Sequence, residues 1–201
     1  MMKEYTLGVL GLGLLVLLLG CSDSGEAVTD SSANQQGELD AVHWRYATDP
    51  HGSSASYSAE LVQDGIAQIA FYRVPRVDAQ NNSWVELIYD LPNGSLQGAS
   101  GLRLSYQSSN DLVVKLAQLE YGEQGDQSYA HYQAVLPAAT SDWQEATLSL
   151  ADFQRPYWTP ATSVDQGIVP AHVSAIYLVP DLTDEAGGEA SLSIRAVELI
   201  K

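Results

Sequence analysis

The sequence predicts an all-β protein, a two-sheet antiparallel β-sandwich with the jelly-roll arrangement. Beyond residue 37, short segments of alternating apolar and polar residues recur, and clusters of Gly, Pro, Asn, Asp and Ser separate them. Such alternation is typical of strands, whereas no segment after residue 20 has the period of an amphipathic helix. About nine strands in one domain of ordinary size is the content expected of a single sandwich.

The first twenty residues predict a signal peptide. Positive charge from Lys3 and the α-amine precedes a run of Leu, Val and Gly over residues 7–20. This run is shorter than the ~20 residues that a membrane-spanning helix needs, so it favours a signal over a permanent anchor. It ends in Leu18-Leu19-Gly20-Cys21, which resembles the lipobox of bacterial lipoproteins.

The lipobox resemblance implies cleavage after residue 20 and acylation of Cys21. Because Cys21 is the single cysteine of the chain, no internal disulfide can form. Ser22 follows it, and similarity to the enterobacterial sorting rule implies the outer membrane of a bacterial cell envelope. We therefore expect a lipid-anchored protein whose mature chain starts at Cys21.

Residues 21–37 predict a disordered tether, and residues 38–201 predict the folded domain. The tether has little apolar content beyond Ala27-Val28, so it cannot bury enough surface to offset its ordering entropy. The formal net charge of the chain is −16, which repels nucleic acid and anionic lipid. We exclude both as partners of the folded domain, so the lipid anchor is the expected contact with the membrane.

The strand over residues 83–91 shows the alternation best. One face carries Val85, Leu87, Tyr89 and Leu91, and the other carries Trp84, Glu86 and Ile88. Apolar residues change phase within the last strand, between Ile194 and Val197, which predicts a β-bulge or burial on both faces. The predicted strands cover residues 41–46, 54–62, 66–73, 83–91, 102–106, 111–121, 129–135, 143–150, 173–179 and 191–200.

Residues 129–158 form the most informative stretch. Two alternating segments, 129–135 and 143–150, flank a turn that begins at Pro137, and an aromatic loop with Tyr157 and Trp158 follows. We interpret the two segments as adjacent antiparallel strands, with Leu148 in the core. Exposed aromatics at the end of such a pair are suited to presenting a ligand surface.

The four tryptophans divide into two groups. Trp44 and Trp143 are expected in the core, the latter as a lid at the corner of a strand. Trp84 lies opposite an apolar face, and Trp158 follows Tyr157 in the loop. For each of these two, packing against a covering loop and contact with a ligand both remain open.

Motifs of common enzymes are absent from the sequence. It has no Gly-x-Ser-x-Gly, His-Glu-x-x-His, P-loop or Cys-x-x-Cys motif, and its four histidines are scattered. Glu86 and a second carboxylate would suffice for a glycosidase pair, but acidic residues are too common here for that pairing to be informative. We therefore predict a protein that is not an enzyme and needs no cofactor.

Several short motifs follow one another along the chain: Trp44, Gly52-Ser53-Ser54, Trp84-Val85-Glu86-Leu87, Gly101-Leu102-Arg103-Leu104, Tyr132-Gln133-Ala134, Trp143-Gln144, Leu150-Ala151-Asp152-Phe153 and Trp158. Taken in this order, they resemble galactose-binding-like jelly rolls, in particular family 11 carbohydrate-binding modules and mitochondrial complex I intermediate-associated proteins. The resemblance implies a β-jelly roll, often with a structural calcium ion, that binds sugar on a concave sheet or at edge loops. No calcium ligand can be matched residue by residue.

These observations predict a membrane-anchored lipoprotein whose sandwich binds a polysaccharide or oligosaccharide without catalysis. Aromatic rings would stack on pyranose rings, and polar side chains would bind hydroxyl groups. The alternative is an envelope assembly or scaffold lipoprotein that binds another protein. The candidate carbohydrate-binding residues, which either project from the faces opposite the core or rim them, are Trp84, Glu86, Arg103, His131, Gln133, Tyr157 and Trp158.

Overall fold

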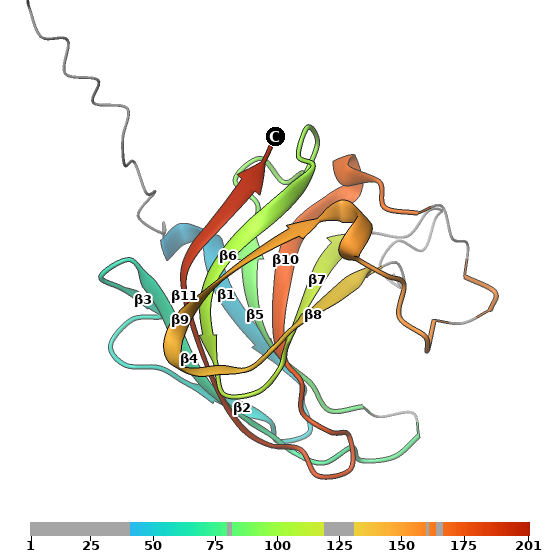
Figure 1. Cartoon of the computed structure of the whole chain (residues 1–201). Coiled ribbons are helices and arrows are strands. Elements are labelled where there is room, and N and C mark those ends of the chain that lie inside the picture. Colours follow the sequence, from blue (N-terminus) through green and yellow to red (C-terminus); the bar gives the residue numbers. More distant parts are fainter. Residues whose placement is uncertain (1–40, 80–81, 119–130, 160, 164–166) are drawn as a thin grey trace, which may run out of the picture. The chain divides into compact units, whose positions relative to one another are not determined.

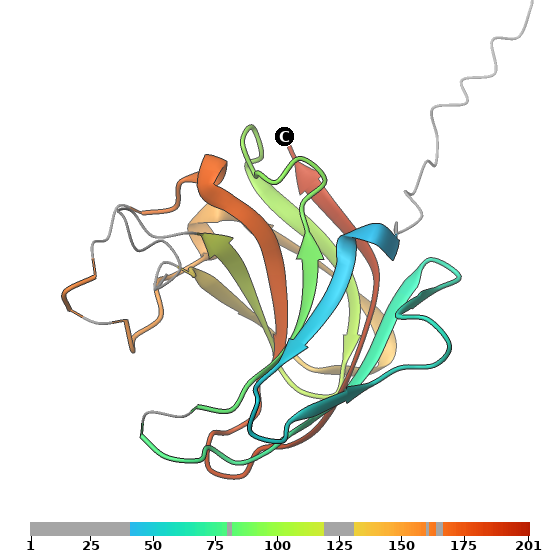
Figure 2. The same cartoon turned by 180° about the vertical axis from the view of Figure 1, so that it is seen from behind.

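Two antiparallel sheets packed face to face make up the described part of the chain (Figures 1 and 2). The computed structural model describes residues 41–79, 82–118, 131–159, 161–163 and 167–201, all within one compact unit, residues 35–201. The expected signal peptide, Cys21 and the expected tether lie outside the described residues. Among the residues described, no helix is long and apolar enough to span a membrane.

Sheet A has five strands and sheet B has six. In spatial order, sheet A contains β1 (Trp44–Thr48), β5 (Val85–Asp90), β10 (Val173–Pro180), β7 (Leu112–Gln118) and β8 (Gln133–Leu136). Sheet B contains β2 (Ser54–Ser56), β4 (Ile66–Arg73), β11 (Gly188–Ile200), β6 (Gly101–Ser108) and β9 (Ala139–Ser149), and β3 (Val62–Gln63) pairs with β4. Three short 3-10 turns complete the described structure: η1 (Ala41–His43), η2 (Leu150–Asp152) and η3 (Pro170–His172).

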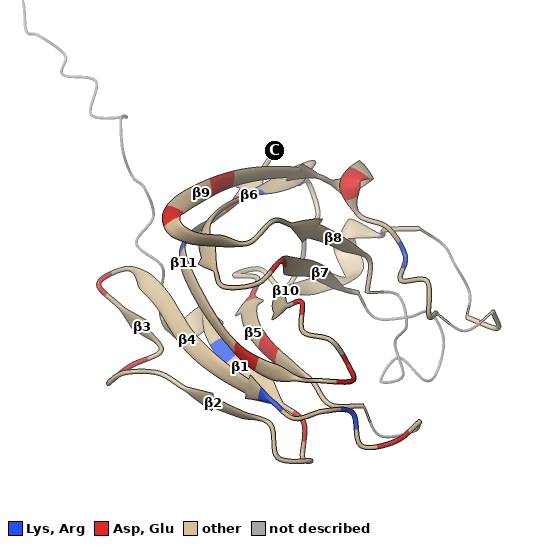
Figure 3. Cartoon of the chain, turned by 60° about the horizontal axis from the view of Figure 1, so that its bottom comes forward, with Lys and Arg blue, Asp and Glu red and all other residues tan. Residues whose placement is uncertain are grey.

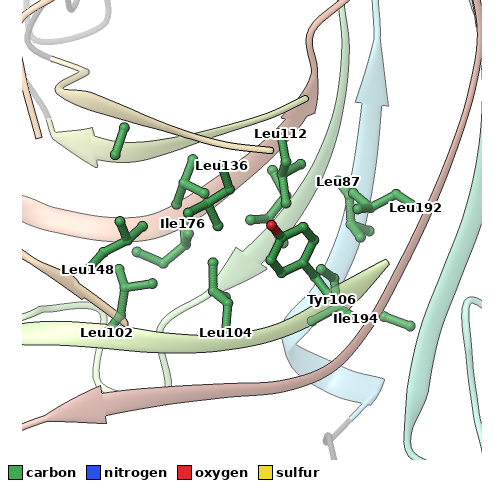
Figure 4. Close-up of a cluster of buried hydrophobic side chains, with 14 of the residues drawn as sticks. Leu87, Leu102, Leu104, Tyr106, Leu112, Leu136, Leu148, Ile176, Leu192 and Ile194 are labelled. Carbon is green, nitrogen blue, oxygen red and sulfur yellow. The ribbon is translucent and has the colours of Figure 1, made fainter. Parts of the chain in front are cut away.

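One hydrophobic core fills the space between the sheets. Alternate residues of each strand point inward, so Leu102, Leu104 and Tyr106 of β6 face the inward residues of sheet A (Figure 4). The buried ring of Tyr106 keeps its hydroxyl satisfied by donating to the Pro137 carbonyl at 2.9 Å. Trp44 and Leu148 are both buried here, which confirms their predicted core positions.

The predicted hairpin over residues 129–150 is wrong in one respect. β8 pairs with β7 at the edge of sheet A, whereas β9 pairs with β6 at the edge of sheet B. Pro137 ends β8 because it has no amide hydrogen for the ladder. The Ala138 amide then donates to Asp111 Oδ1 at 2.9 Å as the chain passes between the sheets. A turn within one sheet and a crossing between two sheets have the same local chemistry, so the sequence did not distinguish them.

The predicted β-bulge in the last strand is confirmed. On β6, Tyr106 pairs with Ile194 and Ser105 pairs with Ala196, so Arg195 is the additional residue of β11. The insertion changes the phase of the strand. It lets Ile194 and Val197 pack on the same core although they are three positions apart.

Trp143 is not the core lid that we expected. Its ring is partly exposed, and the Arg195 guanidinium carbon lies 4.7 Å from the ring centroid. Arg195 also donates to Ser105 Oγ at 2.6 Å and to Glu145 Oε1 at 2.9 Å. The cause is the bulge, because the additional residue supplies an arginine that covers the tryptophan from outside the sheet.

Candidate functional site

A cleft of about 550 Å³ opens at one end of sheet A, where β5 and β7 begin and β10 ends. Figure 3 is turned toward this end of the sandwich. Four of the seven predicted binding residues line this cleft: Trp84, Gln133, Tyr157 and Trp158. They come from three separate regions of the chain, so the fold brings together what the sequence presents apart. We call this hollow the sheet A cleft.

Trp84 is held by its backbone. Its amide donates to Asp49 Oδ2 at 2.8 Å, and the Asp49 amide donates back to the Trp84 carbonyl at 3.0 Å. Burial alone would raise the pKa of Asp49, but hydrogen bonds from Ser53, Trp84 and His51 lower this pKa below its ordinary value. Because the carboxylate stays charged and fixed, the ring of Trp84, which is 37% exposed, projects from a rigid base.

Arg73 connects the two walls of the cleft. Its buried guanidinium donates to the carbonyl and the hydroxyl of Ser83, each at 3.1 Å, beside Trp84. On the other wall it donates to the Leu182 carbonyl at 2.5 Å and pairs with Asp184. A planar guanidinium can satisfy several acceptors at once in a fixed geometry, so Arg73 sets the distance between the walls.

Lys115 and Glu86 form an ion pair on the outer face of sheet A. Lys115 Nζ lies 3.2 Å from Glu86 Oε1, and both side chains are mostly buried. Lys115 lines the cleft, whereas Glu86 reaches it only through this partner. Glu86, which we predicted to bind sugar, is therefore the counter-ion that holds a cleft lysine in place. Strand β7 supplies this lysine opposite it.

His131 lies on the same outer face, outside the cleft lining. Its ring meets Tyr177 edge-on, with centroids 5.6 Å apart and planes at 90°. Burial, helped by the charge of Lys115, lowers the pKa of His131 to about 4. The imidazole is thus neutral at neutral pH and is available to exchange hydrogen bonds as donor and acceptor.

Sequence reasoning missed Arg45, Asp90 and Lys115 on this face, and also the partly buried Tyr177 of β10. Arg45 donates twice to Asp90, at 2.7 and 3.0 Å, and burial, with the nearby charge of Glu86, raises the pKa of the Tyr177 phenol. A signal for two of these residues was present. Tyr177 alternates with the core residues beside it, and Lys115 interrupts the apolar run over residues 112–117.

The rim of the cleft carries the most exposed aromatics. Tyr157 is 98% exposed and Trp158 is 52% exposed. Buried Phe153 and Pro156 anchor the loop before them. Gln154 exchanges two backbone hydrogen bonds of 2.8 Å with Gln133 on β8, which fixes the loop against the edge of sheet A.

Arg103 does not join the other candidates. It lies on the outer face of sheet B, where it is exposed and pairs with Glu198 at 3.2 Å. Strand alternation assigns a residue to the inner or outer face of its own sheet. It does not say to which sheet the strand belongs, and this is why Arg103 was grouped with residues of the opposite face.

The described residues do not fit the structural calcium ion that the resemblance implied. Calcium takes six to eight oxygen ligands, mostly carboxylates and carbonyls. Within residues 41–201, apart from the undescribed gaps, no group of three or more His, Cys, Asp or Glu side chains could hold a metal ion. Asp184, which lines the sheet A cleft, contacts Arg73 and Arg76 instead, and Glu86 contacts the cleft residue Lys115.

Solved structures show what this sandwich resembles. The family 11 carbohydrate-binding module of the cellulosomal cellulase Lic26A-Cel5E of Clostridium thermocellum matches with a TM-score of 0.57 at 14% identity, over 79% of this chain and 87% of that one. The chain has the fold of a family 11 carbohydrate-binding module. The predicted all-β sandwich is thereby confirmed.

Two further structures of such modules match over similar lengths. A family 11 module from the same organism, in complex with a β-1,3-1,4-mixed-linked tetrasaccharide, has a TM-score of 0.57 at 13% identity, over 81% of this chain and 93% of that chain. A solution structure of CtCBM11 has a TM-score of 0.51 at 13% identity, over 78% and 87%. Identity this low establishes the fold alone. No family profile and no curated protein matches the chain, and the resemblance to complex I intermediate-associated proteins stays a prediction.

Proposed function

We propose that the domain binds carbohydrate at the sheet A cleft without chemically changing it. The observation that carries the proposal is that three exposed aromatic side chains, Trp84, Tyr157 and Trp158, surround one cleft. The apolar face of a pyranose ring stacks on such rings. Gln133 and Lys115 in the same lining offer an amide and an ammonium group to the sugar hydroxyls.

The charges of the cleft suit an uncharged sugar. Each cation in the lining has a carboxylate partner, since Arg73 and Arg76 both contact Asp184 and Lys115 contacts Glu86. These pairs leave little net charge to attract a polyanion, and the strongly acidic chain as a whole repels one. The tetrasaccharide bound by one structural match, a β-1,3-1,4-mixed-linked glucan fragment, is therefore a reasonable first probe.

The same pairs argue against hydrolysis. Glycosidases generally need one protonated carboxylic acid and one free carboxylate on either side of the scissile bond. Asp184 contacts Arg73 and Arg76, whereas Glu86 contacts Lys115 and does not line the cleft, so these two carboxylates do not flank the cleft as such a pair. This supports a binding module over an enzyme.

The proposal includes a lipid anchor at Cys21, in the outer membrane of a bacterial cell envelope. Its support is the Leu18-Leu19-Gly20-Cys21 junction in a chain with one cysteine. Metabolic labelling with a fatty-acid analogue tests it. Cys21→Ala is expected to abolish labelling and to leave unprocessed precursor. Labelling that persists in the variant would refute the anchor.

The binding site is tested by Trp84→Ala and Trp158→Ala. We expect each to weaken binding of the mixed-linked tetrasaccharide by on the order of 1 kcal/mol, about fivefold in Kd, with little change in melting temperature. A buried structural tryptophan would instead cost roughly 3–5 kcal/mol of stability. Trp143→Ala, on the opposite sheet, is the matched control and should leave affinity for this cleft unchanged.

Calorimetric affinity and melting temperature, measured on the same variants, decide between outcomes. If Trp84→Ala unfolds the domain, the ring is structural. If no neutral oligosaccharide binds the intact protein, the sugar site is abandoned, and the alternative of a scaffold lipoprotein that binds another protein takes its place.

A further inference from the structure

A second groove lies on the outer face of sheet B, across β2, β4 and β11. It consists of two hollows of about 530 and 260 Å³ that share Ser56, Ala70 and Ser191. The strand register places these three residues side by side, because Ser56 pairs with Ala70 and Ala70 pairs with Ser191. The floor of the groove is therefore made of small side chains on three neighbouring strands.

Tyrosines stand at both ends of this groove. Tyr72 follows Ala70 by two positions on β4, on the same outer face, and is 47% exposed. Tyr57, beside Ser56, is 43% exposed and meets Tyr46 edge-on at 5.7 Å. From Tyr72 to Gln68, which lines the far end, the groove follows four residues of β4, roughly 13 Å at the rise of a strand. That length accommodates a short oligosaccharide between two aromatic walls.

The serine hydroxyl groups of the floor form no hydrogen bond with other residues in the described part of the chain. No hydrogen bond among the described residues engages the hydroxyls of Ser54, Ser56 or Ser191, although the Ser191 amide donates to Ser109 Oγ at 2.9 Å. A hydroxyl can donate one hydrogen bond and accept two. A row of free hydroxyls between aromatic rings thus offers what a sugar needs, an apolar stacking surface beside exchangeable hydrogen-bonding groups.

Charge narrows the class of ligand. Of the described residues that line the two hollows, Glu189 alone is charged. A polyanion would find no cation in the groove. The backbones of β4 and β11 are paired on both sides, so a peptide could add a strand only at the outer edge of β2 and not along the floor of the groove.

We propose that this groove is a second carbohydrate-binding site, for an uncharged oligosaccharide, on the sheet opposite the first cleft. The site stands on its own residues and does not depend on sugar binding at the sheet A cleft. With both sites occupied, one molecule holds two glycan chains on opposite faces of the sandwich.

The test uses amide chemical shifts of the isotope-labelled protein in the Trp84→Ala/Trp158→Ala background, where the first cleft is weakened. The probes are the β-1,3-1,4-mixed-linked glucan tetrasaccharide, cellotetraose, laminaritetraose and mannotetraose. We expect at least one to shift the amides of Ser56, Ala70 and Ser191 in a saturable manner. Ala70→Leu, which fills the floor, should weaken that binding at least fivefold, whereas the matched control Ala70→Ser should retain it.

A second pair of variants covers the case in which Ala70→Leu fails to fold. Tyr72→Ala should weaken binding and Tyr72→Phe should keep it, since the ring provides the stacking surface. If no probe shifts the groove amides, or if the shifts are the same in Ala70→Leu and Tyr72→Ala, the second site does not exist. If the shifts in the parent protein are confined to the groove, the second site is upheld and the proposed sugar site at the sheet A cleft is refuted.

Discussion

The outer faces of the two sheets differ in how their polar side chains are used. On sheet A, the cation and carboxylate of the Lys115–Glu86 pair are only 22% and 15% exposed. On sheet B, the members of the Arg103–Glu198 pair are 52% and 47% exposed, and the serine-lined groove has no ion pair among its described residues. Charged positions occur on both sheets in Figure 3, and among the ion pairs of the described residues the Lys115–Glu86 pair of sheet A is the least exposed.

The two proposed binding surfaces therefore differ in what holds their side chains in place. Exposed ion pairs contribute little, typically 0–1 kcal/mol, because water screens them and the side chains lose freedom. Partly buried pairs hold their members in one geometry. At the sheet A cleft, Arg73 with its partners Ser83 and Asp184 fixes the walls that carry Trp84. We infer that ligand affinity on sheet A depends on a rigid network, and that affinity on sheet B depends on the shape of a small-residue floor.

The largest effect should come from the core that both faces share. Leu148→Ala removes a buried side chain of β9 and leaves a cavity, so the free energy of unfolding should fall by about 2–5 kcal/mol. Thr147→Ala, the exposed neighbour on the outer face, is the control and should change stability little. Denaturant titration measures both. If the free energy of unfolding of Leu148→Ala equals that of the parent protein, the assignment of this face of β9 to the core is wrong.

A smaller loss is expected at Arg73, and only for the sheet A cleft. Arg73→Ala leaves the Ser83 and Leu182 carbonyls without their donor, which costs about 1–3 kcal/mol of stability. Because the walls lose their connection, glycan binding at the cleft should weaken even at temperatures where the variant is folded. The control is Arg103→Ala on sheet B, where the pair is exposed. Equal effects of the two variants on cleft binding would remove the distinction between the two faces.

The smallest effect at neutral pH should be that of His131 on sheet A, because its contribution to stability changes only in acid. The pKa of His131 is lowered from 6.5 to about 4 in the folded protein. Between these values the unfolded chain binds the proton and the folded chain does not, so stability should decrease as pH falls from 6.5 to about 4. His131→Gln should flatten this part of the stability profile. A midpoint near 6.5 in an NMR titration of the His131 ring would show that the ring is solvated.

Local features of the fold were predictable from sequence because the period of a strand is a local property. The inward positions of Val85 and Leu87, and the phase change near Arg195, follow from alternation alone. The partner of a strand is not local. The assignment of β8 and β9 to different sheets, and with it the position of Arg103, depends on contacts that alternation does not encode.

The candidate site was predictable in part for the same reason. Exposed aromatics such as Trp84 and Trp158 were found because they oppose an apolar face or follow a proline. The groups that position them were missed. Arg73 is 109 residues from Leu182 in sequence, and no motif connects them. The sheet B groove was missed because serine and alanine are common in strands and loops alike, so only their register makes them a floor.

The register of β1 on β5 has a mechanical consequence. Trp44 pairs with Tyr89 and Thr48 pairs with Val85, so the chain joins sheet A at the end opposite Trp84, roughly 16 Å away along five residues of strand. In the proposed lipid-anchored protein, tension between the anchor and a bound glycan would act along the axes of β1 and β5. The ladder hydrogen bonds would then share the load in shear, instead of opening one after another, which is the direction in which paired strands resist pulling best.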